Sequence, residues 1–267
     1  MTLRLMVAHV PGERDAARRV EAAVFLHAFG NTPEVMEEEY GPFEARSRFV
    51  AVIDEESGSA LGAARLIVAD SSPVKTLVDV AGEPWRLPVA DSLGAVGLTP
   101  RTVWDVASLA VDPRYRAGAA GAEVTLALCH GIWRYARNCG VPGLVTILDD
   151  RVLRVLRVLG LPWQPMAGAT SQPYLGSPAS TPCVFVLETA EIEVPAARPD
   201  LVPALDRGVL RSITVEPADL APTRGTVDPQ AAPPDRPEPS SPPRRDTTGW
   251  RAPTSHRTEQ FANPPGT

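Results

Sequence analysis

The residues best suited to binding chemistry lie in Ser108–Gly121 (SLAVDPRYRAGAAG), a stretch rich in glycine and arginine. An apolar segment typical of a strand leads into a turn, and helix-forming sequence follows the turn at once. The first amide groups of a helix have no partner within it, and the helix dipole gives them partial positive charge. Arg114, Arg116, Gly118 and Gly121 therefore predict a phosphate-binding loop. The alternative is a surface turn with incidental arginines.

Two charged side chains interrupt apolar, strand-like segments: Asp105 in TVWDVASLAV and Arg65 in ALGAARLIVA. A charge on a core strand is costly unless it is paired or used in chemistry. Burial raises the pKa of a carboxyl group, so Asp105 is a candidate catalytic base for an amine, directly or through water. Arg65 is a candidate anchor for a substrate carboxylate. The structural alternatives are an ion pair between the two residues and a solvent-exposed Asp105.

Other catalytic classes have no support in the sequence. It contains no Gly-x-Ser-x-Gly motif, and no cysteine is paired with a histidine in a way that indicates a nucleophile. Cys129, Cys139 and Cys183 lack the spacing of metal ligands, so we expect no metal and three reduced thiols.

The composition is that of a folded, acidic protein. The chain has 267 residues, 44% of them hydrophobic, which is ample for a core of mixed type. Its formal net charge of −6 and pI near 5.3 argue against a general nucleic-acid binder, because such proteins usually carry a basic excess. The first residues lack the pattern of a signal peptide, and no apolar run approaches the ~20 residues of a membrane span. We therefore expect a cytoplasmic protein.

Hydrophobic periodicity predicts a single α/β domain of strands and helices over residues 1–190. The predicted strands are 3–10, 49–53, 60–69, 102–111, 144–148 and 183–187, and the predicted helices are 13–29, 120–138 and 149–159. A long irregular insert occupies 71–101, and a loop of that length in a compact domain is usually functional. Residues 191–214 are ambiguous, with 201–210 readable as one short helix. Proline-rich residues 215–267 cannot bury enough apolar surface to fold, so we expect a disordered C-terminal tail.

The order of these elements, with SLAVDPRYRAGAAG and RVLRVLGLPW at their places in it, resembles the GNAT acyltransferases over residues 3–190. The resemblance implies an α+β fold with a central mixed, mostly antiparallel sheet flanked by helices. It also implies that the loop binds the phosphates of acyl-CoA or of an acyl carrier protein, while the preceding strand binds the pantetheine arm. The residues assigned to these contacts are Leu109, Val111, Arg114, Arg116, Gly118, Ala119, Ala120 and Gly121.

Three positions depart from the pattern of that family. Tyr115 stands where the loop usually has glutamine or arginine, and Ala120 replaces its second glycine. Leu156 replaces the tyrosine that protonates the leaving thiolate in many members. The resemblance therefore implies an altered phosphate loop, and an acid that is lacking or placed elsewhere.

The insert and the strand after it resemble one branch of the family, the autoinducer (acyl-homoserine lactone) synthases and the long-chain N-acyl amino acid synthases. WDVASL is similar to their Trp-Glu-x-Ser-Arg-Phe strand, with Asp105, Ser108 and Leu109 as departures. Arg65 stands where these enzymes keep an arginine on the preceding strand. Because Ser108 replaces the strand arginine, a homoserine-lactone product is in doubt.

The branch implies an acyl chain longer than acetyl. Trp85 in the insert and Trp104 on the strand are the candidate substrate-binding residues that line its tunnel. The alternative for the apolar insert residues is a small satellite core.

We therefore expect an N-acyltransferase that moves an acyl group from acyl-CoA or an acyl carrier protein to a small-molecule amine, with no permanently bound cofactor. Seven arginines against three acids between Arg114 and Arg157 form either a solvated face or a landing site for an acidic carrier protein. Two alternatives remain: a degenerate, non-catalytic GNAT-like binding module, and an ordinary acetyl-CoA-dependent N-acetyltransferase.

Overall fold

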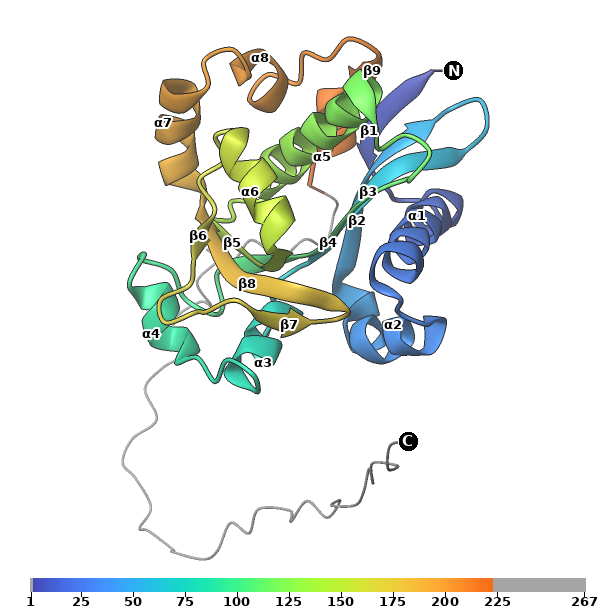
Figure 1. Cartoon of the computed structure of the whole chain (residues 1–267). Coiled ribbons are helices and arrows are strands. Elements are labelled where there is room, and N and C mark those ends of the chain that lie inside the picture. The colour runs from blue at the N-terminus through green and yellow to red at the C-terminus, as the bar shows by residue number, and fades with distance from the viewer. Residues whose placement is uncertain (1, 223–267) are drawn as a thin grey trace, which may run out of the picture. The chain divides into compact units, whose positions relative to one another are not determined.

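The computed structural model describes residues 2–222, in which a nine-stranded sheet has helices on both faces (Figure 1). The strand order is β6-β8-β5-β4-β3-β2-β1-β9, with β7 beside β8. Neighbouring strands are antiparallel except at β4–β5 and β1–β9, which confirms the mixed, mostly antiparallel sheet. The strands are β1 (Leu3–Val7), β2 (Ser47–Asp54), β3 (Ser59–Ile67), β4 (Val103–Val111), β5 (Gly143–Asp149), β6 (Gln164–Pro165), β7 (Gln172–Tyr174), β8 (Ser177–Val186) and β9 (Ile213–Val215).

Two helical layers enclose the sheet. The helices are α1 (Pro11–Phe29), α2 (Pro33–Tyr40), α3 (Lys75–Ala81), α4 (Val89–Gly94), α5 (Gly118–Asn138), α6 (Asp150–Val158), α7 (Leu187–Ala197) and α8 (Val202–Leu205), with 3-10 turns η1 (Gly41–Arg46) and η2 (Pro217–Leu220). Alternate strand residues face opposite layers. Val50 and Val52 share a core with α5, whereas Phe49 and Ala51 pack against α1. No helix within residues 2–222 combines the length and apolar character needed to cross a bilayer.

The insert at 71–101 folds into α3 and α4, so the expectation of an irregular segment is wrong. Leu77, Val80 and Leu93 of these helices are buried in a second core together with Val145 of β5. The two helices have only seven and six residues, too few to show a helical period in the sequence. The apolar residues of the insert thus form a satellite core beneath the sheet.

Residues 187–222 pack onto the body. Helix α7 follows β8 directly, and β9 adds a parallel strand beside β1. Asp219 accepts two hydrogen bonds from Arg4, and Leu220 is buried. The expectation of disorder is therefore wrong for 215–222, because these few residues find partners in β1 and α5 that composition alone does not reveal. The rest of the expected tail, 223–267, lies outside the described residues.

A β-bulge interrupts β4 beside the site. Arg65 of β3 pairs with Ser108 and the next β3 residue pairs with Val106, so Ala107 is the extra residue. Because of this extra residue, Asp105 and Ser108 face the same side of the sheet although they are three positions apart.

Beyond the bulge, β4 and β5 separate. Strand β4 stays paired with β3 as far as Val111, but it pairs with β5 only from Val103 to Asp105. Strand β5 follows β8 over its whole length instead. The sheet is therefore divided into two halves that diverge from a short parallel contact.

Candidate active site

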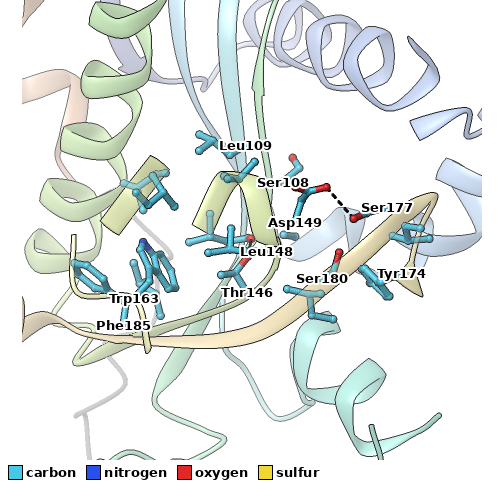
Figure 2. A pocket seen from close by; sticks show the side chains of 18 of the residues that line it. Ser108, Leu109, Thr146, Leu148, Asp149, Trp163, Tyr174, Ser177, Ser180 and Phe185 are labelled. Atoms are coloured by element: carbon cyan, nitrogen blue, oxygen red, sulfur yellow. Dashed lines mark hydrogen bonds between the residues drawn. The ribbon is translucent and has the colours of Figure 1, made fainter. Parts of the chain in front are cut away.

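An apolar cavity of about 120 Å³ lies where β4 and β5 separate (Figure 2). Residues 106–109 of β4 and 146–149 of β5 form two of its walls. Cys129 and Ile132 line it from the α5 layer, while Phe25 and Tyr40 line it from α1 and α2 on the other face of the sheet. The cavity therefore passes through the sheet between its two halves.

The two ends of the cavity differ in polarity (Figure 2). Trp163 and Phe185 lie at the apolar end, with ring centres 5.0 Å apart. Asp149 and Ser177 lie toward the other end and are hydrogen-bonded to one another at 2.8 Å. Hydrogen bonds, chiefly from Arg151, lower the pKa of Asp149 to about 2. Asp149 is therefore ionised at neutral pH.

A buried hydrogen-bonded chain borders the cavity at Ser108. The Ser108 hydroxyl, which lines the cavity, donates to Oε1 of Glu21 at 2.5 Å. Arg65 donates to both carboxylate oxygens of Glu21, at 2.9 and 2.6 Å. Glu21 is 2% exposed and Arg65 is 4% exposed. The chain places a buried carboxylate one hydroxyl group away from the cavity.

Glu21 is not among the residues predicted from the sequence, although the sequence holds a signal for it. Ala17, Val20 and Val24 are buried on one stripe of α1, and Glu21 falls on that stripe. An acid on the buried face of an amphipathic helix needs a partner or a function. The periodicity that identified the helix could have identified this residue too.

Arg65 is enclosed by protein groups. Its remaining terminal nitrogen donates to Glu44 at 2.7 Å and to Ser47 at 3.1 Å. Its guanidinium carbon lies 4.9 Å from the ring centre of Tyr40 and 4.7 Å from that of Phe49. The guanidinium group of Arg65 is therefore already bound by carboxylates of the protein itself. These carboxylates take the place that the sequence-based prediction gave to a substrate carboxylate.

A second cavity, of about 380 Å³, lies between α1, α2 and η1. Its charged lining residues are Arg18, Glu21, Glu37, Glu44 and Arg65. Tyr40 lines this cavity and the apolar one, and the chain of Glu21 and Ser108 reaches from one to the other. The two cavities thus adjoin at Tyr40 and at the Ser108–Glu21 hydrogen bond.

Asp105 lines neither cavity and is fully buried. Its carboxylate accepts hydrogen bonds from the backbone amide and the hydroxyl of Thr76, at 2.6 and 2.8 Å, and so satisfies the start of α3. The considered ion pair with Arg65 is not formed, because Arg65 binds Glu21 instead. Burial raises the pKa of Asp105 to about 7. In this position Asp105 joins the insert to β4.

The loop before α5 brings the expected phosphate-binding residues together. Gly118 has a φ of +71°, and α5 begins there with no side chain capping its first amides. A Cβ atom at Gly121 would lie 2.3 Å from the carbonyl oxygen of Arg116. Only glycine therefore lets the backbone of the loop pack this closely against the first turn of α5. Arg114 is held by Asp112. Arg116 is exposed and makes no ion pair with any residue of 2–222.

Leu109 and Val111 of β4 direct their backbone amides toward the gap between β4 and β5. Asp112 donates its amide to Leu61 of β3 at 2.9 Å. Because the direction of the amides alternates along an antiparallel strand, those of Leu109 and Val111 point away from β3. They face the side from which β5 has withdrawn, where the sequence resemblance places a pantetheine arm.

The two tryptophans expected to contact substrate lie in hydrophobic cores outside the cavity. Trp104 packs on Tyr135 beneath α5, with ring centres 5.6 Å apart. Trp85 belongs to the second core and donates its indole N–H to the carbonyl of Thr170 at 2.8 Å. Leu156, in contrast, lines the cavity.

Comparison with known proteins identifies the fold. No family model matches the chain, and no curated protein matches it as a relative. The chain is similar to the structure of FeeM, an N-acyl amino acid synthase from uncultured soil microbes, with 15% identity, a TM-score of 0.54 and coverage of 73% of this chain and 97% of that one. It is also similar to the AHL synthase LasI, with 15% identity, a TM-score of 0.53 and coverage of 78% and 96%. The chain has the GNAT-like fold of these synthases.

This GNAT-like fold confirms the architecture expected from the sequence. A third structure, of TofI in a ternary complex with an inhibitor and MTA, has 18% identity, a TM-score of 0.50 and coverage of 82% of this chain and 99% of that one. All three similarities in fold extend over nearly the whole of the solved chains.

The buried carboxyl group of Asp105 predicts a pH-dependent stability. Its pKa rises from 3.8 to about 7 on folding, so the folded chain binds this proton more tightly. The stabilisation is full below pH ~4 and is lost as the pH rises through 7. In denaturant titrations between pH 4 and 8, the wild type should lose on the order of 1–4 kcal/mol more than Asp105→Asn. Equal pH slopes for the two proteins would contradict this assignment.

The close approach at Gly121 predicts that Gly121→Ala displaces the loop. The added methyl group overlaps a backbone carbonyl, so we expect a loss of ~1–3 kcal/mol in stability and at least tenfold weaker binding of coenzyme A. Gly12→Ala is the matched control, since a Cβ atom there meets nothing within 4 Å. Calorimetric titration with coenzyme A checks the result, and unchanged binding by Gly121→Ala would reject the loop as the phosphate site.

Proposed function

We propose that this protein is an N-acyltransferase that transfers an acyl group from a pantetheine thioester to the amine of a small molecule. The observation that carries the proposal is the apolar cavity that passes through the sheet between β4 and β5. It offers a thioester an apolar end for the acyl chain, a strand edge for the pantetheine and a buried proton acceptor. The similarity in fold to acyl-transferring synthases supports the same reading.

The donor is held along β4 and at the start of α5. The pantetheine amides pair with the backbone of Leu109 and Val111, whose amides face the separation. The phosphates lie against the first amides of α5, from Gly118 to Gly121, where the helix dipole attracts an anion. The exposed guanidinium of Arg116 adds a charge at the same place.

The acyl chain occupies the apolar end of the cavity, which Trp163 and Phe185 close. An apolar cavity of ~150 Å³ accommodates benzene. The whole cavity, at about 120 Å³, is somewhat smaller, so it favours an acyl group longer than acetyl with at most about five or six carbons.

The reaction needs one proton to leave the attacking amine. The amine nitrogen bonds to the thioester carbonyl carbon, and the carbon–sulfur bond breaks to release the thiolate. The Ser108 hydroxyl accepts the proton of the amine while its own proton moves to Glu21, and that proton passes on to the thiolate or to water. Arg65 is a positioning residue in this scheme, because it fixes both oxygens of Glu21.

The exposed face of α6 supports an acyl carrier protein as the donor. Arg137 is paired with Glu191 and Asp206, and Arg151 is paired with Asp149. Arg137 lies on α5 and Arg151 on α6. The other two arginines of α6, Arg154 and Arg157, are exposed and make no ion pair within residues 2–222. The same helix lines the cavity through residues 152 and 156, so a carrier docked there lies next to it.

The proton relay predicts that Ser108→Ala lowers kcat by roughly 10²-fold or more with hexanoyl-CoA and a pool of primary amines, because general base catalysis is lost. Thiol release and mass spectrometry of the products measure it. Ser92→Ala is the matched control, since it removes a buried hydroxyl that binds only the carbonyl of Ala167. Equal rates for the two variants would reject the relay. If the wild type releases thiol from acetyl-CoA but not from hexanoyl-CoA, the protein is an ordinary acetyltransferase. If it releases thiol from no donor, it is a binding module.

The carrier site predicts a selective loss in the variant Arg154→Glu/Arg157→Glu. Its kcat/KM should fall at least tenfold with a hexanoyl carrier protein and remain unchanged with hexanoyl-CoA, because only the protein donor contacts the face of α6. The control variant is Arg101→Glu/Arg207→Glu, which alters two exposed arginines elsewhere. Equal losses with both donors, or in both variants, would contradict docking at α6.

A further inference from the structure

The polar end of the apolar cavity holds a buried hydroxyl group, on Ser180 of β8, that no other residue of 2–222 uses. We propose that this hydroxyl binds the acceptor, and that the acceptor is a short amino alcohol without a carboxylate group. The inference rests on the proposed acyl transfer and names its second substrate class. The acceptor then lies in the same cavity as Ser108, which takes the proton of its amine in the proposed reaction.

Ser180 differs from the other hydroxyl-bearing residues that line the cavity. It is 2% exposed, and its side chain makes no hydrogen bond with any residue of 2–222. The other hydroxyl groups of the lining all donate to protein oxygens: Ser108 to Glu21, Tyr40 to Ala107, Thr146 to Val106, Tyr174 to Asp79 and Ser177 to Asp149. In Figure 2 the oxygen of Ser180 points into the cavity. A buried hydroxyl without a protein partner favours a ligand that brings a hydrogen-bonding group to it.

The charge of the lining disfavours a carboxylate on that ligand. Asp149, which pairs with Ser180 in the ladder of β5 and β8, is the one charged residue of 2–222 that lines the cavity. Asp149 is ionised at neutral pH, and its counter-ion Arg151 is exposed and lies outside the lining. An acceptor carboxylate would therefore meet a negative charge and no cation, which costs free energy in an apolar site. A neutral oxygen, such as that of an alcohol, avoids this cost.

The cavity opens to solvent at the same end. Phe29, Tyr174 and Leu175 are only half-buried there. Trp163 and Phe185, at the opposite end, are buried. The acyl group fills most of the volume of about 120 Å³, so only a short part of the acceptor fits beside it. A hydroxyl group separated from the amine by a short spacer meets this limit.

This placement leaves the amine free to react. Both oxygens of Asp149 already accept hydrogen bonds, from Ser177 and Arg151, and Glu21 lies behind the hydroxyl of Ser108. Desolvation in an apolar cavity favours the neutral form of an amine. With its hydroxyl group on Ser180, the acceptor can therefore present a neutral amine to the thioester and to Ser108.

Three acceptors that differ at one group test the inference. Ethanolamine carries the hydroxyl, propylamine replaces it with a methyl group, and glycine replaces the hydroxymethyl group with a carboxylate. With hexanoyl-CoA as donor, kcat/KM should be roughly tenfold higher for ethanolamine than for either of the others, because only ethanolamine gains the buried hydrogen bond without burying a charge. Ser180→Ala should abolish the preference for ethanolamine over propylamine. Ser92→Ala, which removes a buried hydroxyl outside the cavity, should retain it.

Calorimetric titration with the amide products separates this inference from the proposed function, since it needs no turnover. N-Hexanoylethanolamine should bind roughly tenfold more tightly than N-propylhexanamide and N-hexanoylglycine, and Ser180→Ala should bind the first two alike. If these results hold but no thiol is released from any donor, acyl transfer fails and the hydroxyl site stands. If the three amides bind alike, if propylamine or glycine reacts as well as ethanolamine, or if Ser180→Ala behaves like Ser92→Ala, the inference is overturned.

Discussion

The separation of β4 from β5 is the constraint on which the rest of the site depends. Two halves of the sheet, each firmly paired within itself, meet only at three residue pairs. Diverging strands leave backbone carbonyls without ladder partners, and a buried carbonyl needs another donor. The hydroxyl groups of Thr146 and Tyr40 supply it, at 2.8 Å to Val106 and 3.2 Å to Ala107. The two strands thus diverge while the carbonyls of Val106 and Ala107 keep hydrogen-bond donors.

The second determinant is the buried charge cluster around Arg65. Burying an ion pair adds little net stability, but removing one partner of a buried pair typically costs ~3–5 kcal/mol. Glu21 is therefore kept at a defined position between the two cavities by a partner that would be left uncompensated without it. In the proposed relay Glu21 receives a proton, and fixed surroundings favour such a step because they need no rearrangement during the reaction.

Much of the fold could be predicted from the sequence, because its strands and long helices carry strong periodic patterns. The strand that became β4 and the helix that became α5 were placed to within two residues. The short helices α3 and α4, and strands such as β9, were not found, since elements of three to seven residues depend on tertiary contacts.

The site was less accessible to sequence reasoning. The residues of the proposed phosphate loop are adjacent in the chain, so one local pattern in the sequence is enough to predict them together. The predicted partner of Arg65 was Asp105 or a substrate, because the helical pattern that marks Glu21 as buried does not show that α1 brings it to Arg65, 44 positions away. The bulge at Ala107 also interrupts the alternation of side chains between the two faces of the sheet, which sequence-based prediction assumes. Ser108 therefore lies on the same face as Asp105.

Strand β9 lies far along the sheet from these groups, yet it has its own consequence. Without it, β1 would present a row of unpaired amides and carbonyls at the edge of the sheet, and such an edge is a template for association with other chains. Three residues, Ile213–Val215, cover part of β1 in parallel register, and Arg4 of that strand is further held by Asp219. The segment after α8 thus shortens the exposed edge that β1 would otherwise offer to other chains.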